Sequence, residues 1–161
     1  MKTKTAQQQL DAFLDKYTNE TAALARVQLK KLRKRLRGAV QMVYDNYNAL
    51  VVGFGPTDRP SEALFSLVMF PKKVCLCFLQ GAKLSDPKQL LRGEGKQVRS
   101  IILADADTLD DPDVEDLISR ALSAAPKKID DGAKGEFIIK SISPKQRPRR
   151  PRKRKQSHLR K

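Results

Sequence analysis

Two glycines and a lysine follow one another in DPKQLLRGEGKQVRSIIL, residues 86–103, in an order that suggests phosphate binding. A true P-loop needs four residues between its first glycine and the Gly-Lys pair, followed by Ser or Thr for magnesium. Here Gly93, Gly95 and Lys96 have the wrong spacing, and Gln97 stands where the hydroxyl is needed. We therefore expect a tight turn in which both glycines adopt positive φ, and no nucleotide hydrolysis.

The cations around this turn leave a second interpretation open. Side chains of Lys and Arg beside exposed backbone amides form a site for a small anionic ligand. The turn would then be a ligand receptor. The candidates for anion binding are Arg92, Lys96 and Arg99.

Cys75 and Cys77 place two thiols on one face of an extended segment. A zinc site needs two more suitable ligands, and the only histidine, His158, lies near the end of the chain. The two cysteines are too close to form an unstrained disulfide, so we expect buried thiols. With no histidine in the folded part, no Ser-His-Asp or Cys-His arrangement is available, and we expect the protein not to be an enzyme.

Acidic residues gather between Asp105 and Asp116. The run lacks the central glycine and the final glutamate of a calcium loop, and capping of the following helix explains much of it. Carboxylates are nevertheless the ligands that hard and borderline cations prefer. The weak candidates for a metal site are Asp105, Asp107, Asp110 and Asp111.

The strongest functional pattern is PKQRPRRPRKRKQSHLRK, residues 144–161, which holds ten Lys and Arg and no acid in a chain of net charge +15. Its prolines and its lack of apolar residues predict a disordered tail. Clustered cations bind polyanions by releasing counterions, with little sequence preference, so we expect non-specific nucleic-acid binding. A solubilising tail or attraction to anionic lipid are the alternatives. The proposed contacts are Lys145, Arg147, Arg149, Arg150, Arg152, Lys153, Arg154 and Lys155.

The spacing of apolar residues predicts two helices before this domain's sheet begins. The first covers residues 6–17. Thr18, Asn19 and Thr21 offer capping side chains for the second, which carries an apolar stripe over residues 29–43, with Gly38 as a terminator or a kink. The other faces of the second helix are basic over residues 26–37. This basic surface either extends the footprint of the tail or is simply solvated.

Short apolar runs typical of strands follow. LVVGFG, ALFSLVMF, KVCLCFLQG and VRSIILA predict four strands, of which the second and third form an antiparallel hairpin through Pro-Lys-Lys. EFIIKSIS is either a fifth short strand or an extended start of the tail. LSDPKQLL predicts one or two helical turns, and a final helix should begin after Asp111, with Pro112 in its first turn.

This order of elements does not alternate as parallel βαβ units do. We therefore expect an α+β fold, in which two N-terminal helices and one C-terminal helix pack on an antiparallel sheet of four to five strands. The expected division is an N-terminal helix over residues 1–18, the α+β domain over 19–143 and the disordered basic tail over 144–161. No segment has the pattern of a signal peptide or a membrane span, so we expect a cytoplasmic protein without a membrane partner.

The stretch FPKKVCLCFLQGAKLSDPKQLLRGEGKQVRSI, residues 70–101, resembles the YdhG-like family, a bacterial domain family of largely unknown function that includes a frataxin-like iron chaperone. The shared pattern is a hairpin strand, Gly-Ala-x-Leu-x-Asp-Pro, a Leu-Leu pair, Gly-x-Gly-Lys and a downstream Arg. The resemblance covers about residues 20–124 and implies an α+β fold with an antiparallel sheet. The matching residues are Gly81, Ala82, Leu84, Asp86, Pro87, Leu90, Leu91, Gly93, Gly95, Lys96 and Arg99.

The residues and the resemblance together lead to one main hypothesis. We expect a small binding protein without a cofactor, whose basic tail associates with nucleic acid. The resemblance implies a frataxin-like iron chaperone as an alternative, with iron held by the acidic run. A receptor for a small anion at the Gly-x-Gly-Lys turn is the other alternative.

Overall fold

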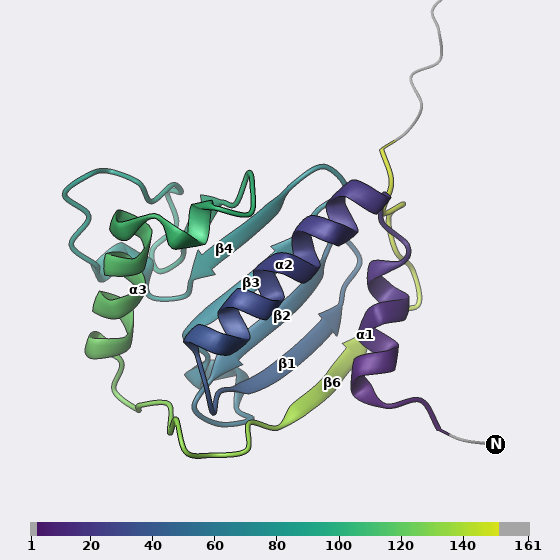
Figure 1. Ribbon diagram of the computed structural model, residues 1–161, viewed down its shortest axis with the longest axis horizontal. Helices are drawn as coiled ribbons and strands as arrows, with labels where there is room; N and C mark the ends of the chain where they lie inside the picture. Colours follow the sequence, from purple (N-terminus) through teal and green to yellow (C-terminus); the bar gives the residue numbers. More distant parts are fainter. Residues whose placement is uncertain (1–2, 152–161) are drawn as a thin grey trace, which may run out of the picture.

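A computed structural model describes residues 3–151 (Figure 1). The α-helices in this range are α1 (Ala6–Leu14), α2 (Asn19–Arg35) and α3 (Pro112–Ala124). The strands are β1 (Val40–Asp45), β2 (Leu50–Gly55), β3 (Phe65–Met69), β4 (Val74–Phe78), β5 (Arg99–Ile102) and β6 (Phe137–Ile142). Three short 3-10 helices, η1 (Pro60–Glu62), η2 (Gly81–Lys83) and η3 (Thr108–Asp110), lie in the connections.

The strands of the described residues form one six-stranded sheet in the order β5-β4-β3-β2-β1-β6. Strands β1 to β5 pair antiparallel with their neighbours, whereas β6 runs parallel to β1, with Val43 opposite Ile139. After α3 the chain crosses to the far edge of the sheet and enters β6 in the direction of β1 (Figure 1). The α+β class is confirmed, but the expectation of a purely antiparallel sheet with four to five strands was wrong.

The strand that the sequence pattern missed is β1. The predicted apolar stripe of the second helix continued to Val43, but α2 ends at Arg35 and Gly38 adopts a φ of +84°. A Cβ atom at Gly38 would lie 1.8 Å from the carbonyl oxygen of Asp130, so this turn requires glycine. Val40 and Val43 are three residues apart, a spacing that suits both a helix and a strand buried on both faces.

Capping side chains start the helices where the sequence predicted. The Thr18 hydroxyl accepts a hydrogen bond from the Thr21 amide at 3.2 Å. At α3, the Asp111 carboxylate accepts from the Asp113 amide at 2.8 Å, and Pro112 occupies the first turn. Such caps satisfy amide groups that have no partner inside the helix.

The predicted helical turns in LSDPKQLL are absent from the described structure. Instead, the Asp86 carboxylate accepts hydrogen bonds from the amides of Leu90 and Leu91, at 2.9 and 2.8 Å. Gln89 has a φ of +53°, which a right-handed helix does not allow. The side chain of Asp86 therefore organises a loop, and the helical expectation for this segment was wrong.

The hydrophobic core lies between the helices and one face of the sheet, with α2 crossing that face (Figure 1). Leu29 and Leu32 of α2 are buried there together with Val52, Leu67 and Leu76, which sit side by side on β2, β3 and β4. Burying one such side chain contributes roughly 1.5–3 kcal/mol. No helix among the described residues is long and apolar enough to cross a membrane.

Candidate functional site

The segment after β6 is attached to the domain up to residue 150. The Ser143 amide donates to the Asp45 carbonyl at 2.8 Å, and the Arg147 amide donates to the Tyr47 carbonyl at 2.9 Å. The guanidinium of Arg147 also lies over the ring of Tyr47, 5.5 Å from its centroid. These contacts hold the first part of the predicted tail against the β1–β2 connection.

Arg149 is the centre of this attachment and only 4% of its surface is exposed. Its Nη2 atom lies 2.9 Å from Oδ1 of Asp45, whose side chain is 1% exposed, and Nη2 also donates to the Asn46 carbonyl. Lys16 completes the cluster, with its Nζ atom 2.9 Å from Oδ2 of Asp45. We call Lys16, Asp45 and Arg149 the anchor cluster.

The charge of Asp45 is stabilised by these contacts. Burial alone would raise the pKa of its carboxyl, but the hydrogen bonds from Lys16, Gln146 and Arg149 outweigh that effect. The net result is a pKa below the ordinary value for aspartate. The carboxylate is therefore ionised at neutral pH and holds Arg149 inside the protein.

The expectation of a disordered tail from residue 144 was therefore wrong up to Arg150, the last residue of the described segment that contacts the domain. Of the proposed nucleic-acid contacts, Lys145, Arg147 and Arg150 are exposed, whereas Arg149 is buried and bound to Asp45. The other predicted contacts lie outside the described residues. They are Arg152, Lys153, Arg154 and Lys155.

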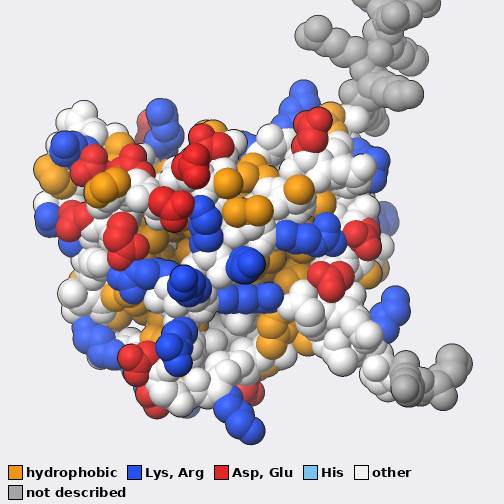
Figure 2. Space-filling model, in the orientation of Figure 1, with side chains coloured by type: hydrophobic (Ala, Val, Ile, Leu, Met, Phe, Trp, Pro, Cys, Tyr) orange, Lys and Arg blue, Asp and Glu red, His pale blue; other side chains and the backbone are white. Residues whose placement is uncertain are grey.

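The basic surface of α2 is partly neutralised by acids of the domain. Three of its cations pair with carboxylates at 3.0 Å or less: Arg26 with Asp15, Lys31 with Asp110 and Arg35 with Glu115. The exposed cations Lys30 and Lys34 of α2, and Arg37 just after it, have no carboxylate within 4.0 Å in residues 3–151. Figure 2 shows Lys and Arg side chains gathered across the middle of this face, where α2 crosses it.

The Gly-x-Gly-Lys segment is a turn that leads into β5, as expected. Gly93 has a φ of +123°, but Gly95 does not have a positive φ, so only one glycine is required by the backbone. Nη1 of Arg99 donates to the carbonyls of Gly95 and Val98, while Lys96 is exposed. Arg92 pairs with Ser100 through backbone hydrogen bonds of 2.8 and 2.9 Å. The guanidinium of Arg99 is thus committed to the turn itself.

Three of the four candidate metal ligands, Asp105, Asp110 and Asp111, have separate local roles. The Asp105 carboxylate accepts hydrogen bonds from the Thr108 hydroxyl at 3.0 Å and from the Asp107 amide at 2.9 Å, and these two bonds lower its pKa. Asp110 pairs with Lys31, and Asp111 caps α3. Within residues 3–151, no group of three or more His, Cys, Asp or Glu side chains is placed to hold a metal ion.

The two thiols lie on one face of β4, as predicted. Cys75 pairs with Val68 and Cys77 with Ser66 in the register of β3 and β4. Both are free; Cys75 is buried and Cys77 is partly buried. Burial raises the pKa of both thiols and thereby favours their protonated form.

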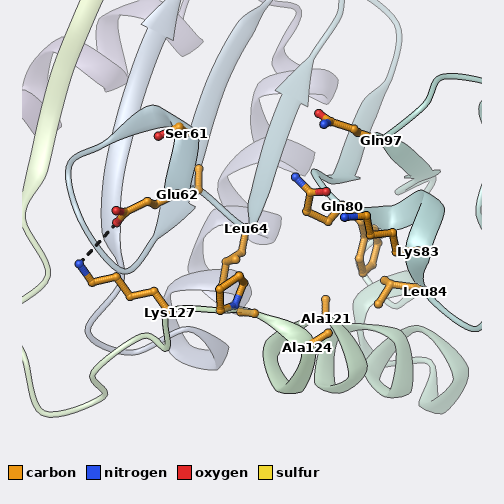
Figure 3. Close-up of a pocket in the computed structure, with 14 residues that line it drawn as sticks. Ser61, Glu62, Leu64, Gln80, Lys83, Leu84, Gln97, Ala121, Ala124 and Lys127 are labelled. Atoms are coloured by element: carbon orange, nitrogen blue, oxygen red, sulfur yellow. Dashed lines mark ion pairs between the residues drawn. The ribbon is translucent and has the colours of Figure 1, made fainter.

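A pocket of about 480 Å³ lies between η1, η2 and the C-terminal end of α3 (Figure 3). Leu64, Phe78, Leu84 and Ala121 give it an apolar lining. No sequence pattern predicted it, because its residues come from three connections, one strand and one helix. The sequence pattern closest to the pocket is the Gly81-Ala82 pair, which begins η2 at the edge of the pocket.

The polar groups of the pocket lie on two opposite rims (Figure 3). On one rim, Lys127 lies 3.7 Å from Glu62. A hydrogen bond of 2.6 Å from the Thr57 hydroxyl is the main cause of the lowered pKa of Glu62. Lys83 and the amides of Gln80 and Gln97 occupy the other rim.

The chain was compared with protein-family models, curated proteins and solved structures. No protein-family model, curated protein or solved structure matches the chain. The resemblance to the YdhG-like family therefore stays a prediction from the residues that carry it.

Proposed function

We propose that this protein is a non-enzymatic binding protein that associates with nucleic acid through its basic C-terminal segment, without sequence specificity. The observation that carries the proposal is the run of ten Lys and Arg from Lys145 onward, which contains no acid. A polyanion gains affinity from such a run because each neutralised phosphate releases counterions.

The described part of the segment supports this proposal in one respect. The anchor cluster fixes the chain at Arg149, and the neighbouring Lys145, Arg147 and Arg150 are exposed at the same edge of the domain. A polyanion bound there would meet these cations together with the residues that follow Pro151. The exposed cations of α2 would add a weaker, second contact surface.

The test is to shorten the chain at a point that spares the anchor cluster. A chain ending at Pro151 loses six Lys and Arg but keeps Arg149 on Asp45. We expect it to remain folded and to lose most of its binding to a 20-base-pair DNA and to a single-stranded RNA at about 50 mM salt. Fluorescence anisotropy with labelled nucleic acid measures the affinity.

A second variant tests whether the shortened chain loses nucleic-acid binding because it lacks positive charge or because it is shorter. A full-length variant in which Arg152, Lys153, Arg154 and Lys155 are all replaced by Gln is the matched control. We expect it to flatten the slope of log K against log salt by roughly 0.9 for each phosphate of duplex DNA that the variant no longer neutralises. Binding that is equal in the full chain, the shortened chain and this variant at about 50 mM salt would reject the proposal.

A further inference from the structure

The pocket beside η2 has the size and lining of a small-molecule site. Its volume of about 480 Å³ falls in the range of roughly 300–1,000 Å³ that is typical of ligand pockets. Phe78 in its lining is 1% exposed, and its ring packs edge to face on Phe65 at a centroid distance of 5.5 Å. Since Phe78 is held from behind by the core, the apolar side of the pocket exists before any ligand binds.

The charges of the lining are unequal. The lining holds two cations, Lys83 and Lys127, and one anion, Glu62. Lys127 is paired with Glu62, whereas Lys83 has no carboxylate within 4.0 Å among the residues that the structure describes. The pocket therefore has one positive charge to offer, on the rim that also carries the amides of Gln80 and Gln97.

That rim is built rigidly from the backbone. The Ala82 amide donates to the Gln97 carbonyl at 2.9 Å, which ties η2 to the segment before β5. A Cβ atom on Gly81 would lie 2.6 Å from Cβ of Arg99, so only glycine allows this close approach. The backbone of Lys83 is therefore held in place, and its side-chain amine is the flexible part of the rim.

The geometry points to a binding site for a small amphipathic carboxylate, an aromatic ring or short alkyl chain that carries one negative charge. The apolar body lies against Leu64, Phe78 and Leu84, and the carboxylate accepts hydrogen bonds from Lys83 and from the glutamine amides. An inorganic anion would gain nothing from the apolar lining. A neutral apolar molecule would leave the charge of Lys83 without a partner. This site is separate from the basic segment and does not depend on its function.

The experiment uses 2-naphthoate as the probe and 2-naphthol as its neutral counterpart, with the full chain. The chain contains no Trp, so the fluorescence of the naphthyl group reports binding directly. We expect 2-naphthoate to bind more tightly than 2-naphthol. Lys83→Gln should weaken 2-naphthoate roughly ten-fold, the size of one hydrogen bond to a charged group, and leave 2-naphthol unchanged.

Two controls locate the site. Lys72→Gln removes an exposed lysine of the β3–β4 hairpin and should not change the affinity, and a chain ending at Pro151 should also bind 2-naphthoate normally. Ala124→Phe, at an exposed lining position, should exclude both probes. In the unmodified protein, amide NMR shifts on adding 2-naphthoate should centre on Phe78, Leu84 and Gln97. Equal loss in Lys72→Gln and Lys83→Gln, or shifts confined to residues 145–151, would overturn the inference.

Discussion

Two clusters of acidic and basic side chains lie in different parts of the domain and differ in burial and in pairing. In the anchor cluster, Asp45 and Arg149 are both almost fully buried and lie 2.9 Å apart. At the pocket, Glu62 and Lys127 are 3.7 Å apart, the lysine side chain is 61% exposed, and Lys83 has no acidic partner in residues 3–151. An unpaired charge in the protein interior is strongly destabilising, so the buried charges of the anchor cluster pair with each other and have a structural role. The exposed ones remain available to a ligand.

The largest expected effect comes from breaking the buried pair. Arg149→Met removes the cation and leaves Asp45 buried with Lys16 as its remaining charged partner. We expect the free energy of unfolding to fall by about 3 kcal/mol, at the lower end of what is typical when one member of a buried ion pair is removed. Urea denaturation followed by circular dichroism measures this change.

Arg150→Met is the matched control, because Arg150 is exposed and, within residues 3–151, its side chain makes one hydrogen bond, to the Lys16 carbonyl at 3.3 Å. We expect a change below about 0.5 kcal/mol, as for most surface substitutions. Equal stability of the Arg149 and Arg150 variants would show that burial of the anchor cluster contributes little to folding.

The anchor cluster also shows where sequence patterns stop being informative. In the sequence, Arg149 is one of ten similar cations, and nothing local distinguishes it from Arg147 or Arg150. Its partner Asp45 ends β1, a strand whose apolar residues have helical spacing, so its position next to the C-terminal segment could not be foreseen. The contact joins residues 104 positions apart, and only the parallel pairing of β6 with β1 brings them together.

Local signals were predicted more successfully. Thr18, Asp111 and Pro112 mark helix starts because capping depends on residues a few positions away. The β3–β4 hairpin follows from a short link between two apolar runs. The pocket could not be predicted, because it depends on contacts between residues that are distant in sequence. Its apolar side combines Leu64, Phe78 and Ala121, which have the pattern of ordinary core residues.

The next expected effect is a loss of stability in acid that is specific to the anchor cluster. The pKa of Asp45 in the folded protein is lower than its ordinary value, so folding favours the ionised form. Its contribution to stability is therefore complete above the ordinary aspartate pKa of about 3.9 and is lost as the pH falls from there through the folded-state pKa. The stability difference between the unmodified protein and Asp45→Asn should narrow over that interval.

Urea midpoints measured between about pH 7 and pH 3 test this dependence, because they bracket the ordinary aspartate pKa. Glu62→Gln serves as the comparison at the other cluster, where the ion pairs of the carboxylate with Arg59 and Lys127 are long, at 3.8 and 3.7 Å. Its effect on the midpoint should be small at every pH. A difference between the unmodified protein and Asp45→Asn that stays constant down to the acid end would contradict an ionised, stabilising Asp45.

The smallest expected effect concerns the ligand site and follows from the inference about the pocket. Glu62 lies 3.7 Å from Lys127 and 3.8 Å from Arg59, and only Lys127 lines the pocket. Glu62→Gln removes this acid and leaves Lys127 free to attract a bound carboxylate. The affinity for 2-naphthoate should rise about two- to three-fold, because the exposed ion pair with Glu62 no longer competes for Lys127, while 2-naphthol binding should not change.

Asp58→Asn is the matched control, because Asp58 is an exposed acid in the same β2–β3 connection. It should not change either affinity. A gain of the same size in both variants would mean that overall charge, and not release of Lys127, is responsible. Such a result would remove the distinction between a cluster committed to the fold and one open to a ligand.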